Sequence, residues 1–217
     1  LGFAEGFEDY AFIGHFLDGR NAAFSQGDIG RLYWGRVKSM QRNVLYLKPR
    51  TLLMLDTVYP SDRDVEANLL YQTARLQDIT AGGGVSAIEK GGNTLYIHHL
   101  APERPRVEQV ETPHYFYTLL RENPLVKEGM LVVSGKTDGN PLVMANLLTS
   151  TKGERPDVTT ARGDGCVTGK AGNVPFAFST RPGHIYTTGE YATDALAVTW
   201  DGSTTFTALA TSLSRDS

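Results

Sequence analysis

Short stretches of alternating apolar and polar residues, separated by glycine and proline, run along most of the chain. The clearest stretch is Val37 to Leu47, where Val44 and Tyr46 fall on one side of an extended strand and Leu45 falls on the other. Side chains of a strand alternate between its two faces, so this pattern predicts a β-strand with two differently placed faces.

The next segment, Thr51 to Tyr59, is nearly continuous in apolar residues. A strand that is apolar on both sides is typically buried on both faces. We therefore expect Leu53 to Leu55 to be covered from above and below, with no room for a reaction centre of its own. Lys48 to Arg50 predicts a hairpin turn between the two strands, because proline presets φ.

Turn-forming residues also separate three later pairs of apolar segments, which predict β-hairpins. The pairs are Val85 to Glu89 with Thr94 to Leu100, Met130 to Ser134 with Leu142 to Thr149, and Ala195 to Trp200 with Thr204 to Leu213. Val65 to Thr73 predicts a further strand. Hairpins join antiparallel neighbours, and no ten-residue helical period separates the strands. The predicted fold class is all-β, a large antiparallel two-layer β-sandwich built from hairpins.

Three segments follow this pattern less closely. Phe7 to Asn21 is compatible with a short helix or an irregular loop, Phe116 to Asn123 with a helical turn, and Ala161 to Asn173 with a loop and a sheet edge. No internal repeat or low-complexity linker is evident. We expect residues 1–217 to form a single β-sandwich domain, with a weak joint near Arg121 to Gly129.

The composition is that of a globular protein, with 41% hydrophobic and 21% charged residues. The net charge of −3 argues against nucleic-acid binding, which needs a concentrated basic face. Cys166 is the single cysteine, so no disulfide forms within the chain, and this scarcity of cysteine is compatible with a bacterial exported protein. No apolar run is long enough to span a membrane.

Several motifs follow one another in order through the first part of the chain. They are Gly27-Asp28, Tyr33, Arg42 to Pro49, Leu53 to Val58, the leucine-rich segment Asn68 to Thr73, and Thr94 to Pro102. Their order and spacing resemble the β domain of heparinase II/III-type polysaccharide lyases, over residues 25 to 150. The remainder of the chain is compatible with a β tail.

This resemblance implies a larger enzyme that cleaves uronate polysaccharides by β-elimination. The reaction needs neutralisation of the C5 carboxylate, a base for the C5 proton and an acid for the departing O4. In the family, a tyrosine on an N-terminal α/α toroid and a histidine from the early β domain serve the reaction. The toroid is absent from this chain and the early β segment would precede Leu1. We therefore expect the isolated chain to be inactive, and its catalytic residues are unknown.

The resemblance also bears on metal binding. Family members with a structural zinc carry a histidine near the end of the leucine-rich strand, where this chain has Gln72. An amide oxygen is a poor zinc ligand. The five histidines show neither H-x-H nor H-x-x-x-H spacing. We expect no metal and no cofactor.

Arg42 and Asp56 lie on adjacent predicted strands and can pair. The favoured interpretation is a structural ion pair that fixes the strand register. The alternative is that Arg42 meets a substrate carboxylate, since a guanidinium group suits two-point contact with a carboxylate.

Tyr33, Trp34 and Arg36 are candidate substrate-binding residues, because an aromatic ring beside a cation offers a stacking surface and a charge for a uronate. His98 and His99 are further candidates. They are adjacent on one strand and should point to opposite faces, so each would act alone. The alternative for all five residues is packing within the core.

These observations favour the β-sandwich segment of a periplasmic or extracellular heparinase II/III-like lyase. Such a segment would support and flank the cleft for an acidic polysaccharide or oligosaccharide, and its partner would be an α-helical toroid, upstream or on a separate chain. Two alternatives remain open. One is a stand-alone carbohydrate-binding or adhesion module, and the other is a purely structural interaction domain.

Overall fold

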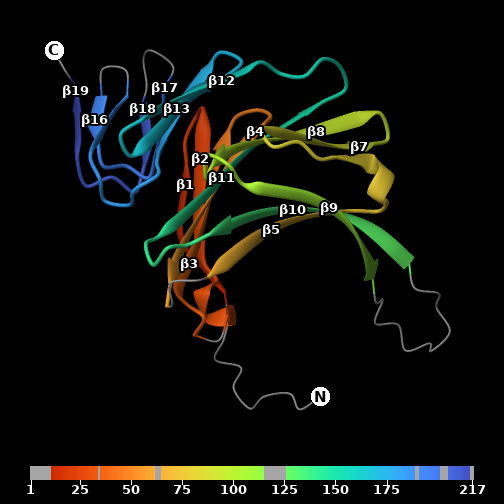
Figure 1. Ribbon diagram of the computed structural model, residues 1–217. Helices are drawn as coiled ribbons and strands as arrows, with labels where there is room; N and C mark the ends of the chain where they lie inside the picture. The colour runs from red at the N-terminus through yellow and green to blue at the C-terminus, as the bar shows by residue number, and fades with distance from the viewer. Residues whose placement is uncertain are drawn as a thin grey trace.

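The computed structural model describes residues 11–33, 35–61, 65–114, 126–188, 191–200 and 205–215 (Figure 1). These residues form antiparallel β-sheets joined by turns, with two short 3-10 helices, η1 (Gly30–Tyr33) and η2 (Leu76–Asp78). The all-β sandwich predicted from the sequence is therefore confirmed. One sheet lies at the centre, and other sheets pack on both of its faces, so the sandwich has one layer more than the two that the sequence predicts.

The central sheet has eight strands in the order β1-β2-β3-β4-β11-β8-β7-β6. Their bounds are β1 (Phe12–Asp18), β2 (Ala22–Asp28), β3 (Val37–Leu47), β4 (Thr51–Pro60), β11 (Leu142–Thr151), β8 (Asn93–Ala101), β7 (Val85–Lys90) and β6 (Ile79–Thr80). The strands that the sequence predicts at Val37 to Leu47 and Thr51 to Tyr59 are β3 and β4, and they pair through the turn at Pro49.

A three-stranded sheet covers part of one face of the central sheet (Figure 1). It consists of β5 (Glu66–Thr73), β10 (Val126–Lys136) and β9 (Arg106–His114), in the order β5-β10-β9. Leu69, Leu131 and Val133 from this sheet pack with Val58 and Met144 of the central sheet in one core, which we call the lower core.

A five-stranded sheet covers the opposite face. Its order is β12 (Val158–Gly163), β13 (Cys166–Ala171), β14 (Val174–Ser179), β17 (Ala197–Trp200) and β18 (Thr205–Ala208). Phe176 and Phe178 from this sheet pack with Leu53, Leu55 and Leu147 in a second core, which we call the upper core. A small sheet of β15 (Tyr186–Thr188), β16 (Tyr191–Thr193) and β19 (Leu213–Arg215) lies beside it near the C-terminus.

Strand β4 has the double burial that its apolar sequence predicts. Leu53 and Leu55 are 0% exposed and belong to the upper core. Val58 and Met54 face the other way, into the lower core. From Leu53 to Val58, β4 lies between β3 and β11 and between two covering sheets, so its backbone and both of its faces are occupied there, whereas Leu52 stays partly exposed.

One predicted hairpin is wrong. The hairpins β7–β8 and β17–β18 form as expected, but β10 belongs to the three-stranded sheet while β11 lies between β4 and β8 in the central sheet. The connection bends away at Thr137, whose backbone N–H donates to the Val65 carbonyl at 2.9 Å. A turn signal shows that the chain reverses, but not whether the second strand pairs with the first or crosses to another layer.

The less regular segments also differ from expectation. Phe7 to Asn21, taken as a helix or loop, contains strand β1, and Ala161 to Asn173 contains β13 and the end of edge strand β12. Phe116 to Asn123 lies outside the described residues. The expected joint near Arg121 to Gly129 is described only from residue 126, where the chain is already part of β10.

No helix in the described residues is long and apolar enough to cross a membrane.

Replacement of Leu53 by alanine tests the double burial of β4. Removing a fully enclosed leucine leaves a cavity, so we expect Leu53→Ala to lower the free energy of unfolding by about 3 kcal/mol. The neighbouring Leu52 is 36% exposed, and Leu52→Ala is the matched control, with an expected loss of about 1 kcal/mol or less. Urea denaturation followed by circular dichroism measures both. Equal losses for the two variants would contradict the layered position of β4.

Candidate functional site: an arginine held on the open half of the central sheet

The three-stranded sheet leaves β1, β2 and the later part of β3 largely uncovered on the lower face, whereas Val37 and Met40 at the start of β3 belong to the lower core. Two adjoining hollows of about 720 and 260 Å³ lie over these strands. The residues that line them are apolar or small, apart from a few charged side chains; they include Phe16, Ser25, Val44, Tyr46 and Leu52 in the larger hollow and Ile13, Gly27 and Arg42 in the smaller. We call this surface the open face.

Arg42 is the cation that lines the smaller hollow, and Asp56 holds it in place. The two residues are opposite one another in the β3–β4 register. Arg42 Nε donates to Asp56 Oδ1 at 2.9 Å, and Arg42 Nη2 donates to Asp56 Oδ2 at 2.8 Å. Asp56 is fully buried, whereas the Arg42 side chain is 41% exposed. A two-point contact of this kind fixes the plane of the guanidinium group and leaves its outer edge at the surface.

The charges of this pair depend on each other. Hydrogen bonding to Asp56 raises the pKa of Arg42, so the guanidinium stays charged. Burial raises the pKa of Asp56, and the hydrogen bonds from Arg42 oppose that rise. The loss of Arg42 would therefore leave a buried carboxyl group without its counter-charge, which costs more than the loss of an exposed ion pair.

Tyr71 comes from the adjacent sheet and lies close enough to interact electrostatically with both members of the pair. Burial raises its pKa, so the phenol stays protonated. Its buried hydroxyl has no hydrogen-bond partner within the described part of the chain. Sequence reasoning missed Tyr71, and the only available signal was its place at the end of the leucine-rich segment, directly before Gln72.

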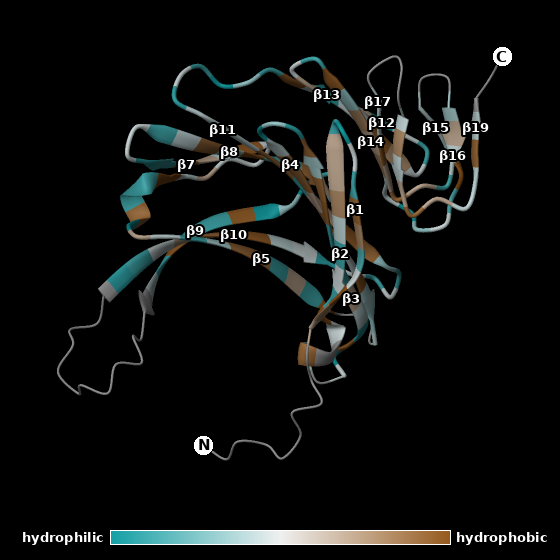
Figure 2. Cartoon of the chain, turned by 180° about the vertical axis from the view of Figure 1, so that it is seen from behind, coloured by the Kyte–Doolittle hydropathy of each residue, from teal (hydrophilic) through white to brown (hydrophobic). Residues whose placement is uncertain are grey.

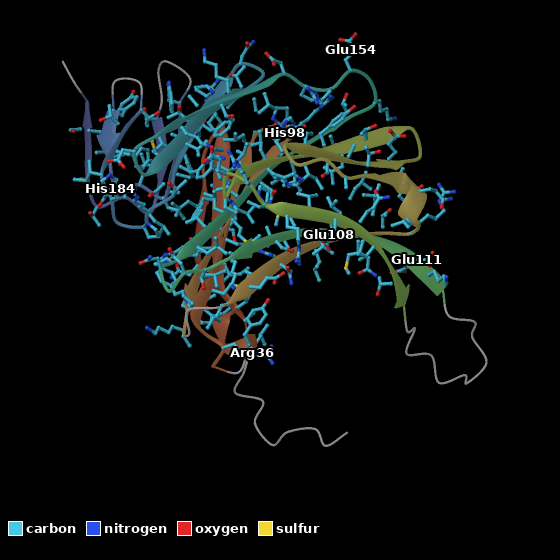
Figure 3. All side chains as sticks on the ribbon, in the orientation of Figure 1. Arg36, His98, Glu108, Glu111, Glu154 and His184 are labelled. Atoms are coloured by element: carbon cyan, nitrogen blue, oxygen red, sulfur yellow. The ribbon has the colours of Figure 1, made fainter. Side chains whose placement is uncertain are left out.

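Tyr33 and Arg36 lie where the chain enters β3. Asp28 organises this entry, because its carboxylate accepts hydrogen bonds from the Gly30 backbone N–H at 2.8 Å and from the Ser39 hydroxyl at 3.0 Å. Tyr33 is 42% exposed and contributes to the electrostatic environment of Arg42. Arg36 is exposed, and Figure 3 labels it at the lower end of the molecule. Trp34 lies outside the described residues.

His98 and His99 are not part of the open face. Both are buried, with 6% and 7% exposure, because each face of β8 is covered by another sheet. Figure 3 places His98 near the opposite end of the molecule from Arg36. The side chain of His98 lies near Arg155; burial, Arg155 and His99 together lower the pKa of His98 to about 4. Its Nε2 has no hydrogen-bond partner in the described structure.

His99 belongs to a buried polar network on β7, β8 and β11. Its Nδ1 lies 2.7 Å from Asn146 Oδ1, and its Nε2 lies 2.9 Å from Ser86 Oγ. Burial lowers the pKa of His99, which fits a neutral ring that donates to Asn146 and accepts from Ser86. The order Ser, His, Asn resembles a nucleophile with its base and orienting group. Ser86 is only 1% exposed, however, so Ser86, His99 and Asn146 form a packed network that no substrate reaches.

Gln72, which occupies the position of a zinc-binding histidine in the resemblance, donates from Nε2 to Glu128 Oε2. Among the residues that the structure describes, no group of three or more His, Cys, Asp or Glu side chains is placed to hold a metal ion.

The comparisons with known proteins identify the fold. No family model and no curated protein matches the sequence. Solved structures do match: heparan sulfate lyase HepC from Pedobacter heparinus, with a TM-score of 0.59 and 14% identity over 73% of this chain, and a heparinase III gene product, with a TM-score of 0.58 and 12% identity over 75%. Another heparinase III structure has a TM-score of 0.59 and 7% identity over 91% of this chain.

In each case the chain spans 26% of the length of the matched structure. At these identities the likeness shows the fold, which is that of a β-sandwich part of heparinase lyases.

The replacement of Arg42 by glutamine tests how strongly the buried carboxyl group depends on it. We expect Arg42→Gln to lower the free energy of unfolding by about 2–3 kcal/mol, somewhat less than for a fully buried pair because Arg42 is partly exposed. Arg106→Gln is the matched control: it breaks the exposed Arg106–Glu66 pair, and we expect a loss of about 1 kcal/mol or less. Similar losses in the two variants would show that Asp56 does not need its partner.

The buried histidines predict a loss of stability in acid. Both are neutral in the folded protein, whereas in the unfolded chain they bind a proton below about pH 6.5. The unfolded state then binds more protons, so stability falls as the pH drops, for His98 down to its folded pKa of about 4. From this shift we expect His98 alone to account for roughly 2–3 kcal/mol of the loss.

Urea titrations across this pH range measure the effect. The slope of unfolding free energy against pH should be smaller in His98→Asn than in the wild type. An unaltered slope in His98→Asn would contradict the neutral, buried state of this residue.

Proposed function

We propose that this chain is the β-sandwich part of a polysaccharide lyase of the heparinase III kind, and that its open face flanks the cleft for a uronate polysaccharide. The observation that carries the proposal is Arg42, a half-exposed guanidinium that a fully buried carboxylate fixes where the open face meets the covered part of the sheet. The fold likeness to heparinase lyases over 73% to 91% of the chain supports the same assignment.

The chemistry of the open face suits contact with an acidic sugar. The guanidinium of Arg42 offers charge to a carboxylate, and Arg36 adds a second cation at the entry to β3. Tyr33 offers exposed aromatic surface for a sugar ring, and Trp34 stays a candidate on its residue type and sequence position alone. Arg42 is thus both the structural partner of Asp56 and the main substrate contact.

Proton transfer is assigned to another part of the enzyme. β-Elimination needs a base and an acid within reach of the sugar, and the carboxylate of Asp56 is buried against Arg42. Of the two histidines considered as sugar contacts, neither reaches the open face. We assign the acid and base to an α-helical partner domain, on the same polypeptide or a separate one, in the periplasm or outside the cell.

The edge strand β1 offers a surface on which such a partner can rest. Phe12, Ile13, Phe16 and Leu17 are between 46% and 73% exposed, and Figure 2 shows hydrophobic residues along β1 at the edge of the central sheet. Apolar area of this kind is unusual on a free surface and favours contact with another protein domain. This observation also supports the second candidate function, a structural interaction domain.

The proposal predicts that the 217-residue chain does not cleave uronate polymers by itself. Heparan sulfate and an unsulfated uronate polymer are suitable substrates, and the absorbance of the unsaturated product is the measurement. We expect no increase above the enzyme-free control. Turnover by the pure chain would contradict the assignment of the acid and base to another domain.

The open face should nevertheless bind a uronate oligosaccharide weakly. Arg36→Gln is the informative variant, because Arg36 is exposed and its side chain makes no hydrogen bond or ion pair with the described residues. We expect an affinity about fivefold lower, as for one exposed charge pair. Arg104→Gln, at an exposed arginine between β8 and β9, should bind as the wild type does. Nuclear magnetic resonance titration measures both, and identical affinities would remove Arg36 from the contact surface.

A further inference from the structure

A further hollow, on the other side of the molecule, lies between the outer face of the five-stranded sheet and the small C-terminal sheet. Its volume is about 540 Å³, within the range of small-ligand sites. The residues that line it are Thr159, Thr160, Ala161, Thr168, Gly169, Lys170, Pro175, Thr187, Thr188 and Trp200. We call it the threonine groove.

Strand register explains why these residues share one surface. Thr159 pairs with Lys170, and Lys170 pairs with Pro175, so three neighbouring strands present them on the same face. This face is the one turned away from the upper core, since Phe176, the next residue along β14, is buried in that core. Thr187 and Thr188 on β15 form the facing wall.

Trp200 is held in position at one side of the groove. It packs against the small cluster of Cys166, Ala177 and Tyr186, and its ring lies 6.2 Å from that of Tyr191 at an angle of 58°. Trp200 is only partly buried, so part of its surface remains open to the groove. A fixed aromatic ring beside hydroxyl groups is a suitable surface for a sugar, which has an apolar ring face and a polar edge.

Two polar groups of the groove are available to a ligand. Thr188 is 2% exposed, and its Oγ1 makes no hydrogen bond within the described structure. A buried hydroxyl without a partner is costly, and a ligand hydroxyl would satisfy it. Lys170 is exposed and forms no ion pair with the described residues. The other described residues that line the groove are uncharged, so Lys170 is the charge that they present.

We propose that the threonine groove binds one uronate unit of a glycan, with Trp200 against the sugar ring, Lys170 at the carboxylate and Thr188 at a ring hydroxyl. One positive charge matches one carboxylate better than it matches a densely sulfated sugar. The choice of a uronate as the anion rests on the proposed function. The groove would keep the chain attached to a polymer independently of the open face.

Tryptophan fluorescence of the 217-residue chain tests this site. The sequence has two tryptophans, so Trp34→Phe makes Trp200 the only reporter. The probes are an unsulfated glucuronate-containing tetrasaccharide and its carboxyl-reduced, neutral counterpart. We expect both to change the emission of Trp200, with the acidic probe bound about fivefold more tightly through Lys170.

Three variants test whether the change in Trp200 emission arises from binding in the groove. Lys170→Gln, at an exposed position that does not affect folding, should remove the preference for the acidic probe and keep binding of the neutral one. Thr188→Val should weaken both probes by about fivefold to tenfold. Arg36→Gln, at the entry to β3, is the control and should leave the Trp200 response unchanged.

Three results would overturn the proposal: no change in emission at millimolar tetrasaccharide, a preference for the acidic probe that survives in Lys170→Gln, or a response that Arg36→Gln abolishes. Lyase turnover by the isolated chain would refute the proposed function and leave these binding results as they stand, so the two failures are distinguishable.

Discussion

The double burial of β4 is the constraint on which the rest of the structure depends. Leu53 and Leu55 on one face and Val58 on the other enter separate cores, so two covering sheets must pack on the same central sheet. Apolar burial is the main favourable contribution to folding, and a strand buried on both faces concentrates it. The covering sheets differ in extent, and the lower one stops short of β1, β2 and the later part of β3. The open face is the direct consequence of that mismatch.

The Arg42–Asp56 pair lies at the boundary between covered and open parts of the sheet. Asp56 sits on the doubly buried strand and is fully enclosed, while its partner one strand further out reaches solvent. The position therefore explains both properties of the pair. It fixes β3 against β4, and it also presents a rigid cation on a surface that is otherwise rich in apolar residues. The substrate role remains a proposal, whereas the structural role follows from the geometry.

Local patterns predicted the strands well, because alternation and apolar runs depend on neighbouring residues. Strand β3 begins and ends where its alternating pattern does. The pairing of Arg42 with Asp56 could be predicted because a short turn joins β3 to β4 and brings the two residues opposite one another. Long-range partners could not be deduced in this way. The segment around Met130 pairs with β5 and β9 and not with the next strand, and Tyr71 reaches Arg42 from another sheet. The burial of His98 likewise depends on a covering sheet distant in sequence.

Native-state amide hydrogen exchange along β4 tests the central claim most directly. Amides of β4 are enclosed by β3, β11 and two covering sheets, so the free energy of exchange at Leu53 and Leu55 should equal the global free energy of unfolding measured by denaturant. Edge strand β1 should exchange through local opening at a lower free energy. Exchange at Leu53 and Leu55 as fast as in β1 would contradict the layered architecture, and with it the origin of the open face.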